Sequence, residues 1–116
     1  MKNSLACSNL VIFEPSGYIT AANADEFKDA LTTAVTTQEY SIFLVDMSQV
    51  EFLDSAGLMA VVSTFRLTQD LGRRFSLCSL APSVRMIFEL TQLDRVVEIY
   101  ENREAFEETL DRLIAA

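Results

Sequence analysis

The sequence contains no histidine, and only three glycines, two prolines and two cysteines. The absence of histidine excludes a Ser-His-Asp triad, and the two cysteines form no CxxC pair, so we expect no zinc site. No glycine-rich phosphate loop is present, and no general base of suitable pKa is evident. These absences argue against an enzyme and predict neither a metal nor another cofactor, although they leave weak nucleotide binding open.

The cysteines and the apolar runs indicate the compartment. Cys7 and Cys78 lie far apart, each among apolar neighbours, and we interpret both as free, buried thiols in a reducing environment. Met1 and Lys2 lead into no apolar segment of the kind that a signal peptide needs, and no apolar run approaches the ~20 residues that span a bilayer. These features predict a cytoplasmic protein.

The length and the charge of the chain limit its organisation and its partners. Half of the 116 residues are hydrophobic, which is enough for one core, and we expect a single domain over residues 1–116. The net charge is −8 and the pI is about 4.4. Such a chain repels nucleic acid and anionic membranes, so a protein with a basic surface is the better expected partner.

Hydrophobic periodicity separates strands from helices along the chain. The expected strands are residues 10–13, 18–20, 41–47, 75–80 and 96–100, and the turn residues 14–17 join the first two as a hairpin. The expected helices begin at Asn23, at Asp54–Ser55, at Pro82 and at Asn102, and Gly72 ends the second of them.

This order of elements, β-β-α-β-α-β-α-β-α, predicts an α/β fold. Strands that alternate with helices need right-handed crossovers and therefore pair in parallel. We expect a mixed, mostly parallel sheet of about five strands after the N-terminal hairpin, with four helices packed against it.

Ser55 lies at a junction of this fold that favours a functional site. Sites in open α/β sheets form where the carboxyl ends of strands meet the N-termini of helices. We place Ser55 at the N-cap, where its hydroxyl would accept a first-turn N–H bond, and Asp54 is the alternative cap. A phosphate on Ser55 would meet the positive end of the helix, so we expect phosphorylation to change binding and to leave the fold intact.

The segment around Ser55 carries a family resemblance. Residues 45–58, VDMSQVEFLDSAGL, closely resemble the signature of the STAS domains found in anti-sigma-factor antagonists. In that family an apolar strand ends in Asp, and Asp-Ser-Ser/Ala-Gly-Leu then opens a helix. The resemblance continues at residues 17–19, 81–85 and 90–94, so it covers almost the whole chain in one colinear order.

The resemblance implies a regulatory cycle. The unphosphorylated antagonist binds an anti-sigma factor that is also a serine kinase, which frees the sigma factor. The kinase then phosphorylates the serine that matches Ser55, the complex dissociates, and a PP2C-type phosphatase restores the active form. ATP and metal belong to those partners. We predict Thr20, Asp54, Ser55, Ala56, Gly57 and Met59 as the partner-binding residues.

Several residues leave alternatives open. Thr20 stands where the family commonly has Asp, which bears on recognition by the kinase, whereas Asp46 and Asp54 follow the family pattern. Met59 shares a helix face with Ser55 and could contact a partner or belong to the core. Leu90 and Leu93 pose the same alternative, and there we favour the core.

Two other functions compete with the antagonist. The first is a scaffold or transporter-associated module of the same fold in which Ser55 is only a helix cap. The second is an enzyme that uses Asp46, Asp54 and Ser55 as a hydrolytic cluster, which we disfavour for want of a base. The sequence identifies neither the stimulus nor the oligomeric state, and it leaves a weak homo-oligomer open.

Overall fold

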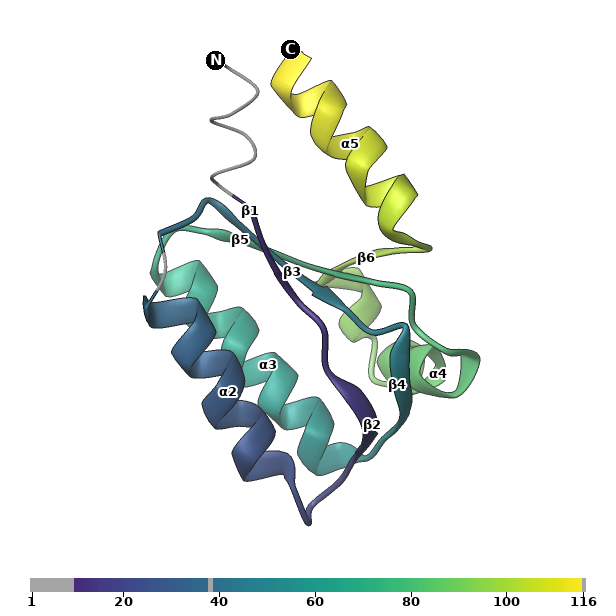
Figure 1. Cartoon of the computed structure of the whole chain (residues 1–116). Helices are drawn as coiled ribbons and strands as arrows, with labels where there is room; N and C mark the ends of the chain where they lie inside the picture. The colour runs from purple at the N-terminus through teal and green to yellow at the C-terminus, as the bar shows by residue number, and fades with distance from the viewer. Residues whose placement is uncertain (1–9, 38, 116) are drawn as a thin grey trace.

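The computed structural model describes residues 10–37 and 39–115, with side chains to residue 112. The expectations for Met1, Lys2, Cys7 and the last apolar residues of the fourth helix therefore lie outside the described part. The strands are β1 (Leu10–Phe13), β2 (Ser16–Ile19), β3 (Ile42–Asp46), β4 (Gln49–Leu53), β5 (Arg74–Cys78) and β6 (Glu98–Tyr100). The helices are α2 (Ala24–Thr37), α3 (Ser55–Asp70), α4 (Pro82–Leu90) and α5 (Arg103–Ala115), with the 3-10 helix η1 (Leu93–Arg95) (Figure 1).

All described strand pairs are parallel, as the alternation of strands and helices predicts. One sheet has the order β1-β3-β5-β6, and β2 pairs with β4 in a second, two-stranded sheet. The α/β class, the four helices and the mostly parallel sheet are therefore confirmed. β4 is absent from the expected strands, and it is the strand that leads directly into α3.

The two N-terminal strands lie where they are predicted, but their pairing differs from that of a simple hairpin. β1 pairs with β3, with Leu10 opposite Ile42. β2 pairs with β4, and its register shifts between Gly17 and Tyr18. Gly17 has a φ of +83°, which favours glycine, and the irregularity beside it bends the chain. β1 and β2 thus continue alongside β3 and β4 (Figure 1).

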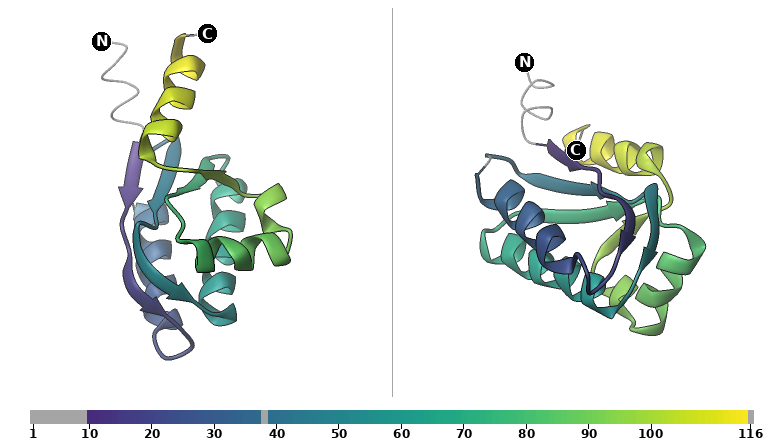
Figure 2. Two further views of the ribbon diagram at one scale, coloured as in Figure 1. Left: turned by 90° about the vertical axis from the view of Figure 1, so that its right-hand side faces the viewer. Right: turned by 60° about the horizontal axis from the view of Figure 1, so that its bottom comes forward.

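Both faces of the larger sheet are covered. Phe43 and Val45 of β3 belong to the main core, which also takes side chains from α2, α3 and α4. Leu44, between them on the strand, belongs to a smaller cluster with Cys78 and with Phe106 of α5. Because neighbouring strand residues point to opposite faces, α5 packs on the face opposite α2 and α3 (Figure 2).

Local chemistry sets the ends of the helices. Gly72, with a φ of +73°, follows α3, and its amide donates to the Gln69 carbonyl at 2.9 Å. Pro82 is the first residue of α4. Asn102 caps α5 through Oδ1, which accepts from the Ala105 amide at 2.8 Å. These three predicted ends are confirmed.

The end of α4 departs from the expectation. Leu90 is 76% exposed, so its predicted place in the core is wrong. Leu93 packs against the core as predicted. The helix stops between the two residues, because Thr91 is its C-cap and Gln92 adopts a left-handed conformation with a φ of 62°.

Candidate functional site

The candidate residues gather where β4 runs into α3, beside the loop from β2 to α2. Asp54 precedes α3, Ser55 is its first residue, and Ala56, Gly57 and Met59 follow within its first turns. Thr20 comes directly after β2, and the Asp54 amide donates to the carbonyl of neighbouring Ile19 at 3.1 Å. The fold therefore brings the predicted residues of the two segments together.

Asp54, and not Ser55, is the N-cap of α3. Its backbone is extended, and Oδ1 accepts from the Gly57 amide at 3.0 Å. The predicted position of Ser55 at the cap is thus wrong by one residue. The Asp54 carboxylate is the better acceptor, because a charged oxygen at a helix N-terminus also meets the positive end of the dipole. The hydrogen bond from the Gly57 amide and weaker contributions from other backbone amides hold the pKa of the Asp54 carboxyl below its usual value.

Ser55 is left with a free hydroxyl. The residue is exposed, and among the described residues its side chain has no hydrogen-bond partner. Because Asp54 performs the capping, the Oγ of Ser55 can react or bind without removing a bond from the fold.

Gly57 is buried and brings α3 into close contact with β2 and β4. A Cβ at this position would lie 2.6 Å from Cδ1 of Leu53, and 2.9 Å from both Cγ2 and the carbonyl oxygen of Ile19. The close approach at this glycine is therefore made by the protein's own chain. It fixes the start of α3, and with it Ser55, against the end of β2.

Thr20 belongs to a loop with its own hydrogen bonds. The Thr20 amide donates to Oδ1 of Asn23 at 2.9 Å, and Oγ1 of Thr20 accepts from the Ala22 amide at 3.2 Å. Asn23 Nδ2 donates to the Tyr18 carbonyl at 2.8 Å. Asn23 precedes α2 as predicted, but its side chain orders this loop. The Asn23 amide donates to the Thr20 carbonyl at 3.0 Å, and the Ala21 amide donates to Oδ2 of Asp54 at 3.0 Å.

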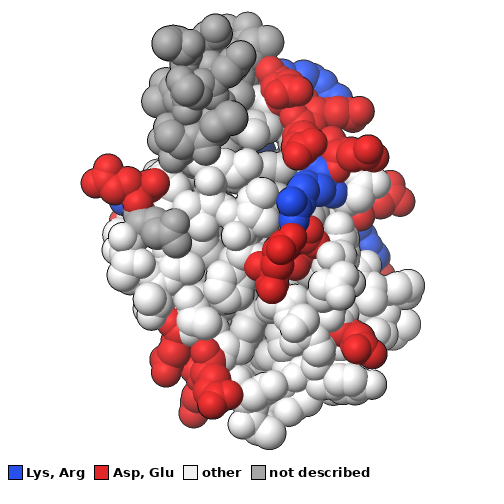
Figure 3. Space-filling model, viewed as in Figure 1, with Lys and Arg blue, Asp and Glu red and all other residues white. Residues whose placement is uncertain are grey.

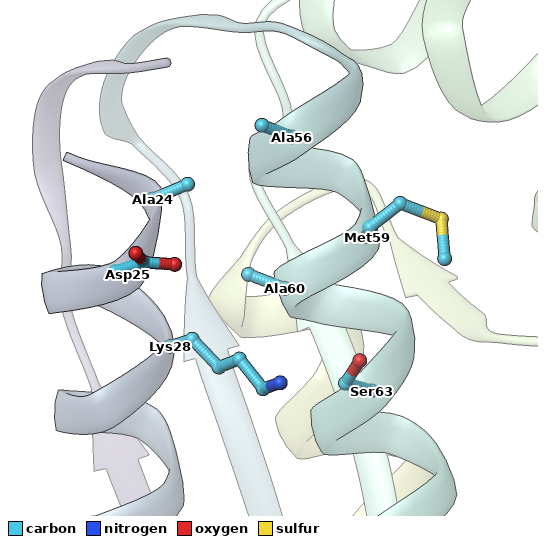
Figure 4. A pocket seen from close by; sticks show the side chains of 7 residues that line it. All are labelled: Ala24, Asp25, Lys28, Ala56, Met59, Ala60 and Ser63. Atoms are coloured by element: carbon cyan, nitrogen blue, oxygen red, sulfur yellow. The ribbon is translucent and has the colours of Figure 1, made fainter. Parts of the chain in front are cut away.

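A shallow groove of about 270 Å³ adjoins this site between α2 and α3. Its walls are mostly small side chains: Ala56, Ala60 and Ser63 of α3 lie opposite Ala24 of α2, and Lys28 reaches across toward α3 (Figure 4). Met59 lies at the rim and is 55% exposed. Of the two alternatives for Met59, the structure favours the exposed position over the core.

Comparison with known proteins now identifies the family. The family model described as "STAS domain" matches residues 5–106. The chain belongs to the STAS family. A Thermotoga neapolitana protein named as a candidate anti-sigma factor antagonist is 31% identical over 105 residues, which are 90% of this chain and 93% of that protein. The crystal structure of a candidate anti-sigma factor antagonist from Thermotoga maritima has a TM-score of 0.77 and 32% identity, over 86% of each chain.

More distant structures share only the fold with this STAS domain. SpoIIAA, an anti-sigma factor antagonist, is known in an unphosphorylated form, with a TM-score of 0.71 and 19% identity over 88% of this chain and 89% of that one. Its phosphorylated form has a TM-score of 0.65 and 18% identity, over 88% and 92%. A sulfate transporter family protein from Wolinella succinogenes has a TM-score of 0.77 and 15% identity, over 93% and 89%.

Asp46 has a structural partner in this STAS domain. Its Oδ2 accepts from the Arg103 guanidinium at 2.6 Å, its Oδ1 accepts from the Ser48 amide at 3.0 Å, and Arg103 also pairs with Glu14. Burial by itself raises the pKa of the Asp46 carboxyl, but the Ser48 and Arg103 bonds outweigh burial and lower that pKa. Asp46 thus joins β3 to α5, and its hydrogen-bond partners are Ser48 and Arg103, neither of which belongs to the start of α3.

Sequence reasoning missed Arg103 and an aromatic pair. Arg103 opens α5 at its positive end, where a cation is unfavourable unless a carboxylate lies near, and that conflict could have revealed its partner. Tyr18 and Phe52 lie opposite each other on β2 and β4, with ring centroids 6.2 Å apart, and are 62% and 41% exposed. The sequence would have indicated this pair only if residues 49–53 had been predicted as a strand that pairs with β2.

Within residues 10–37 and 39–115, no group of three or more Asp, Glu, Cys or His side chains is placed to hold a metal ion. In the same part of the chain, no helix has the length and hydropathy needed to cross a membrane.

Proposed function

We propose that this STAS protein is an anti-sigma factor antagonist controlled by phosphorylation of Ser55. Its unphosphorylated form binds a serine-kinase anti-sigma factor in the cytoplasm and releases a sigma factor. Phosphorylation ends the binding, and a PP2C-type phosphatase restores it. Relatives at about 30% identity that are named as anti-sigma factor antagonists support this function.

The observation that carries the proposal is the free hydroxyl of Ser55. A capping serine accepts a first-turn amide through the same Oγ that a kinase modifies. Here the Asp54 carboxylate accepts the Gly57 amide, and Ser55 is exposed beside it. A kinase can therefore reach Oγ of Ser55, and modification leaves the backbone bonds of α3 in place.

The chemistry belongs to the partner. Oγ of Ser55 attacks the γ-phosphorus of ATP held by the kinase, the bond between the β–γ bridging oxygen and that phosphorus breaks, and ADP leaves. The hydroxyl proton passes to a base of the kinase. The product places about −1.5 to −2 charges on the first residue of α3, and a partner surface docked there meets both the added bulk and the added charge.

The docking face that we propose comprises Thr20 and the first turns of α3 as far as Met59. The exposed pair Tyr18–Phe52 lies on the other face of β2 and β4, away from α3, and we propose it as a second contact area. Acidic side chains gather over α5 and α2, whereas the surface over β2 and β4 is mostly uncharged (Figure 3). Exposed aromatic residues in an uncharged area are typical anchors of protein interfaces. The acidic margins suit a partner with a basic rim.

Binding of Ser55 variants to the purified cognate kinase tests the proposal. Ser55→Asp should weaken binding by more than about tenfold, or about 1.4 kcal/mol, and Ser55→Ala should bind without being switched off by ATP. Ser83→Asp is the matched control, because Ser83 is also an exposed serine in the first turn of a helix. Its affinity should stay unchanged.

Two results would contradict the proposal. Equal affinities of Ser55→Asp and Ser55→Ala would refute docking through this face. Mapping of the phosphorylated residue after incubation with kinase and ATP would refute the switch if the phosphate lay elsewhere. Binding to a transporter, unaffected by either variant, would favour the module function instead.

A further inference from the structure

Asp54 uses all of its polar groups to connect two segments. Its backbone amide donates to the Ile19 carbonyl at the end of β2, and its carbonyl accepts from the Leu58 amide within α3. Its two carboxylate oxygens divide in the same way. Oδ1 accepts from Gly57 in α3, and Oδ2 accepts from Ala21 in the loop of residues 20–23. One side chain therefore bonds to both segments of the candidate site.

The loop has no other side-chain bond of this kind to α3. Its other side-chain hydrogen bonds stay within residues 18–23, where Thr20 and Asn23 bond to each other and to their neighbours, and the Asn23 carbonyl accepts from the Phe27 amide of α2. Among the described residues, the bond from Ala21 to Asp54 is the one side-chain hydrogen bond between this loop and the start of α3. The packing of Gly57 on Ile19 holds the end of β2 next to α3, and the Asp54 carboxylate adds the side-chain bond that holds residues 20–23 near Ser55.

A phosphate on Ser55 would act on that carboxylate first. The two groups belong to adjacent residues, both are anionic, and the pKa of Asp54 is already lowered, so Asp54 stays ionised at neutral pH. Like charges repel, and the phosphate oxygens also compete for the amides at the start of the helix.

The two bonds of the carboxylate differ in their surroundings. The bond to Gly57 is partly buried and spans three residues of one helix start. The bond to Ala21 is exposed and joins residues that are 33 positions apart. An exposed bond to a loop yields before a local bond that the helix itself holds in place.

We propose that phosphorylation of Ser55 displaces the Asp54 carboxylate from the Ala21 amide and so loosens the loop of residues 20–23. Asp54 is then a positioning residue, and this loop, together with Ser55, carries the phosphorylation state to the docking face. The proposal rests on the proposed function in one respect, namely that Ser55 is the phosphorylated residue. It adds that the loop of residues 20–23 responds to the phosphate and that Asp54 transmits the effect to this loop.

The test uses the protein alone. Phosphoserine is incorporated at position 55 during translation, and amide hydrogen exchange is measured by NMR with and without the phosphate. Exchange of the Ala21 amide should become about tenfold faster or more, as expected for the loss of a charge-assisted hydrogen bond. The Ser48 amide is the internal control, because it also donates to an Asp side chain, that of Asp46. Its exchange should not change.

Asp54→Ser provides a matched variant. Serine is a good N-cap, so α3 should persist, but its hydroxyl can replace only one of the two acceptor oxygens. In this variant the Ala21 amide should exchange fast before modification, and phosphoserine at position 55 should accelerate it no further. A structural role of Asp54 alone would predict no dependence on phosphorylation in either protein.

The outcomes separate this inference from the function. Unchanged exchange of Ala21 in the phosphoserine protein overturns the inference, even if that protein no longer binds the kinase. An equal acceleration in Asp54→Ser overturns Asp54 as the transmitting residue. If the kinase does not modify Ser55, the proposed function fails, whereas the exchange result still stands because the phosphate is installed without a kinase.

Discussion

Replacing Gly57 by alanine tests the packing that positions Ser55. In an exposed helix this substitution stabilises by about 1 kcal/mol, because alanine is the better helix former. Here the new Cβ would lie 2.6 Å from Cδ1 of Leu53 and 2.9 Å from two atoms of Ile19, one of them the carbonyl oxygen. All three distances are shorter than a carbon atom tolerates, so the start of α3 must move away from β2.

The loss of stability depends on which of the contacting atoms can move away from the new Cβ. The leucine methyl can rotate, but the Ile19 oxygen belongs to the backbone and accepts the Asp54 amide, so moving it strains a second bond. Overpacking costs typically 1–3 kcal/mol, and we take the upper part of that range. After subtraction of the helix-propensity gain, the variant should be less stable by about 1–2 kcal/mol. For a chain of this size the melting temperature should fall by roughly 5–10 °C.

Urea denaturation and thermal melting of the two proteins measure the effect. Leu53→Val, which removes the nearest methyl group, serves in a double-mutant cycle. Because it relieves one of the three contacts, the double variant should lose less stability than the sum of the single variants. If Gly57→Ala is as stable as the parent protein or more stable, the close packing of α3 on β2 is refuted.

Three further substitutions or probes test other parts of the structure. Asp46→Asn should destabilise the fold by about 1–3 kcal/mol at pH 7. Because the folded-state pKa of Asp46 is lowered, its stabilisation is present above about pH 4 and is lost as the pH falls through that lowered pKa, so the urea midpoints of the two proteins should converge in acid. Met59→Ser should weaken binding to the kinase severalfold and leave the stability unchanged. Leu90→Ser, which replaces an exposed residue on another helix, should change neither the binding nor the stability. Burial raises the pKa of the Cys78 thiol, so in a variant that lacks the other cysteine, Ellman's reagent should react at the rate of unfolding.

The elements that sequence reasoning predicted correctly are those with a strong local signal. The continuous apolar run of β3, Pro82 at the start of α4, and Asn102 before α5 each identify their structure without any tertiary information. Parallel pairing also follows from the order of strands and helices. These features depend on residues that are close in sequence, which is why patterns reveal them.

The features that were missed depend on contacts between distant residues. β4 is short, and its pairing with β2 decides that it is a strand. The cap of α3 was ambiguous because Asp54 and Ser55 are both good N-caps, and the Ala21 amide from the distant loop favours the carboxylate. The pair of Asp46 with Arg103 joins residues 57 positions apart, so no local pattern reports it.

For control by phosphorylation, the position of Ser55 directly after the cap residue Asp54 matters more than the mere presence of a serine at a helix start. Were Ser55 the cap, its Oγ would have to carry both the cap bond and the phosphate, so modification would replace the acceptor of the first turn. With Asp54 as the cap, the Leu58 amide still donates to the Asp54 carbonyl and the Gly57 amide to its carboxylate, while the serine oxygen stays exposed. A modification at Ser55 can then act on the docking face and on the loop of residues 20–23, and the core beneath α3 can remain as it is.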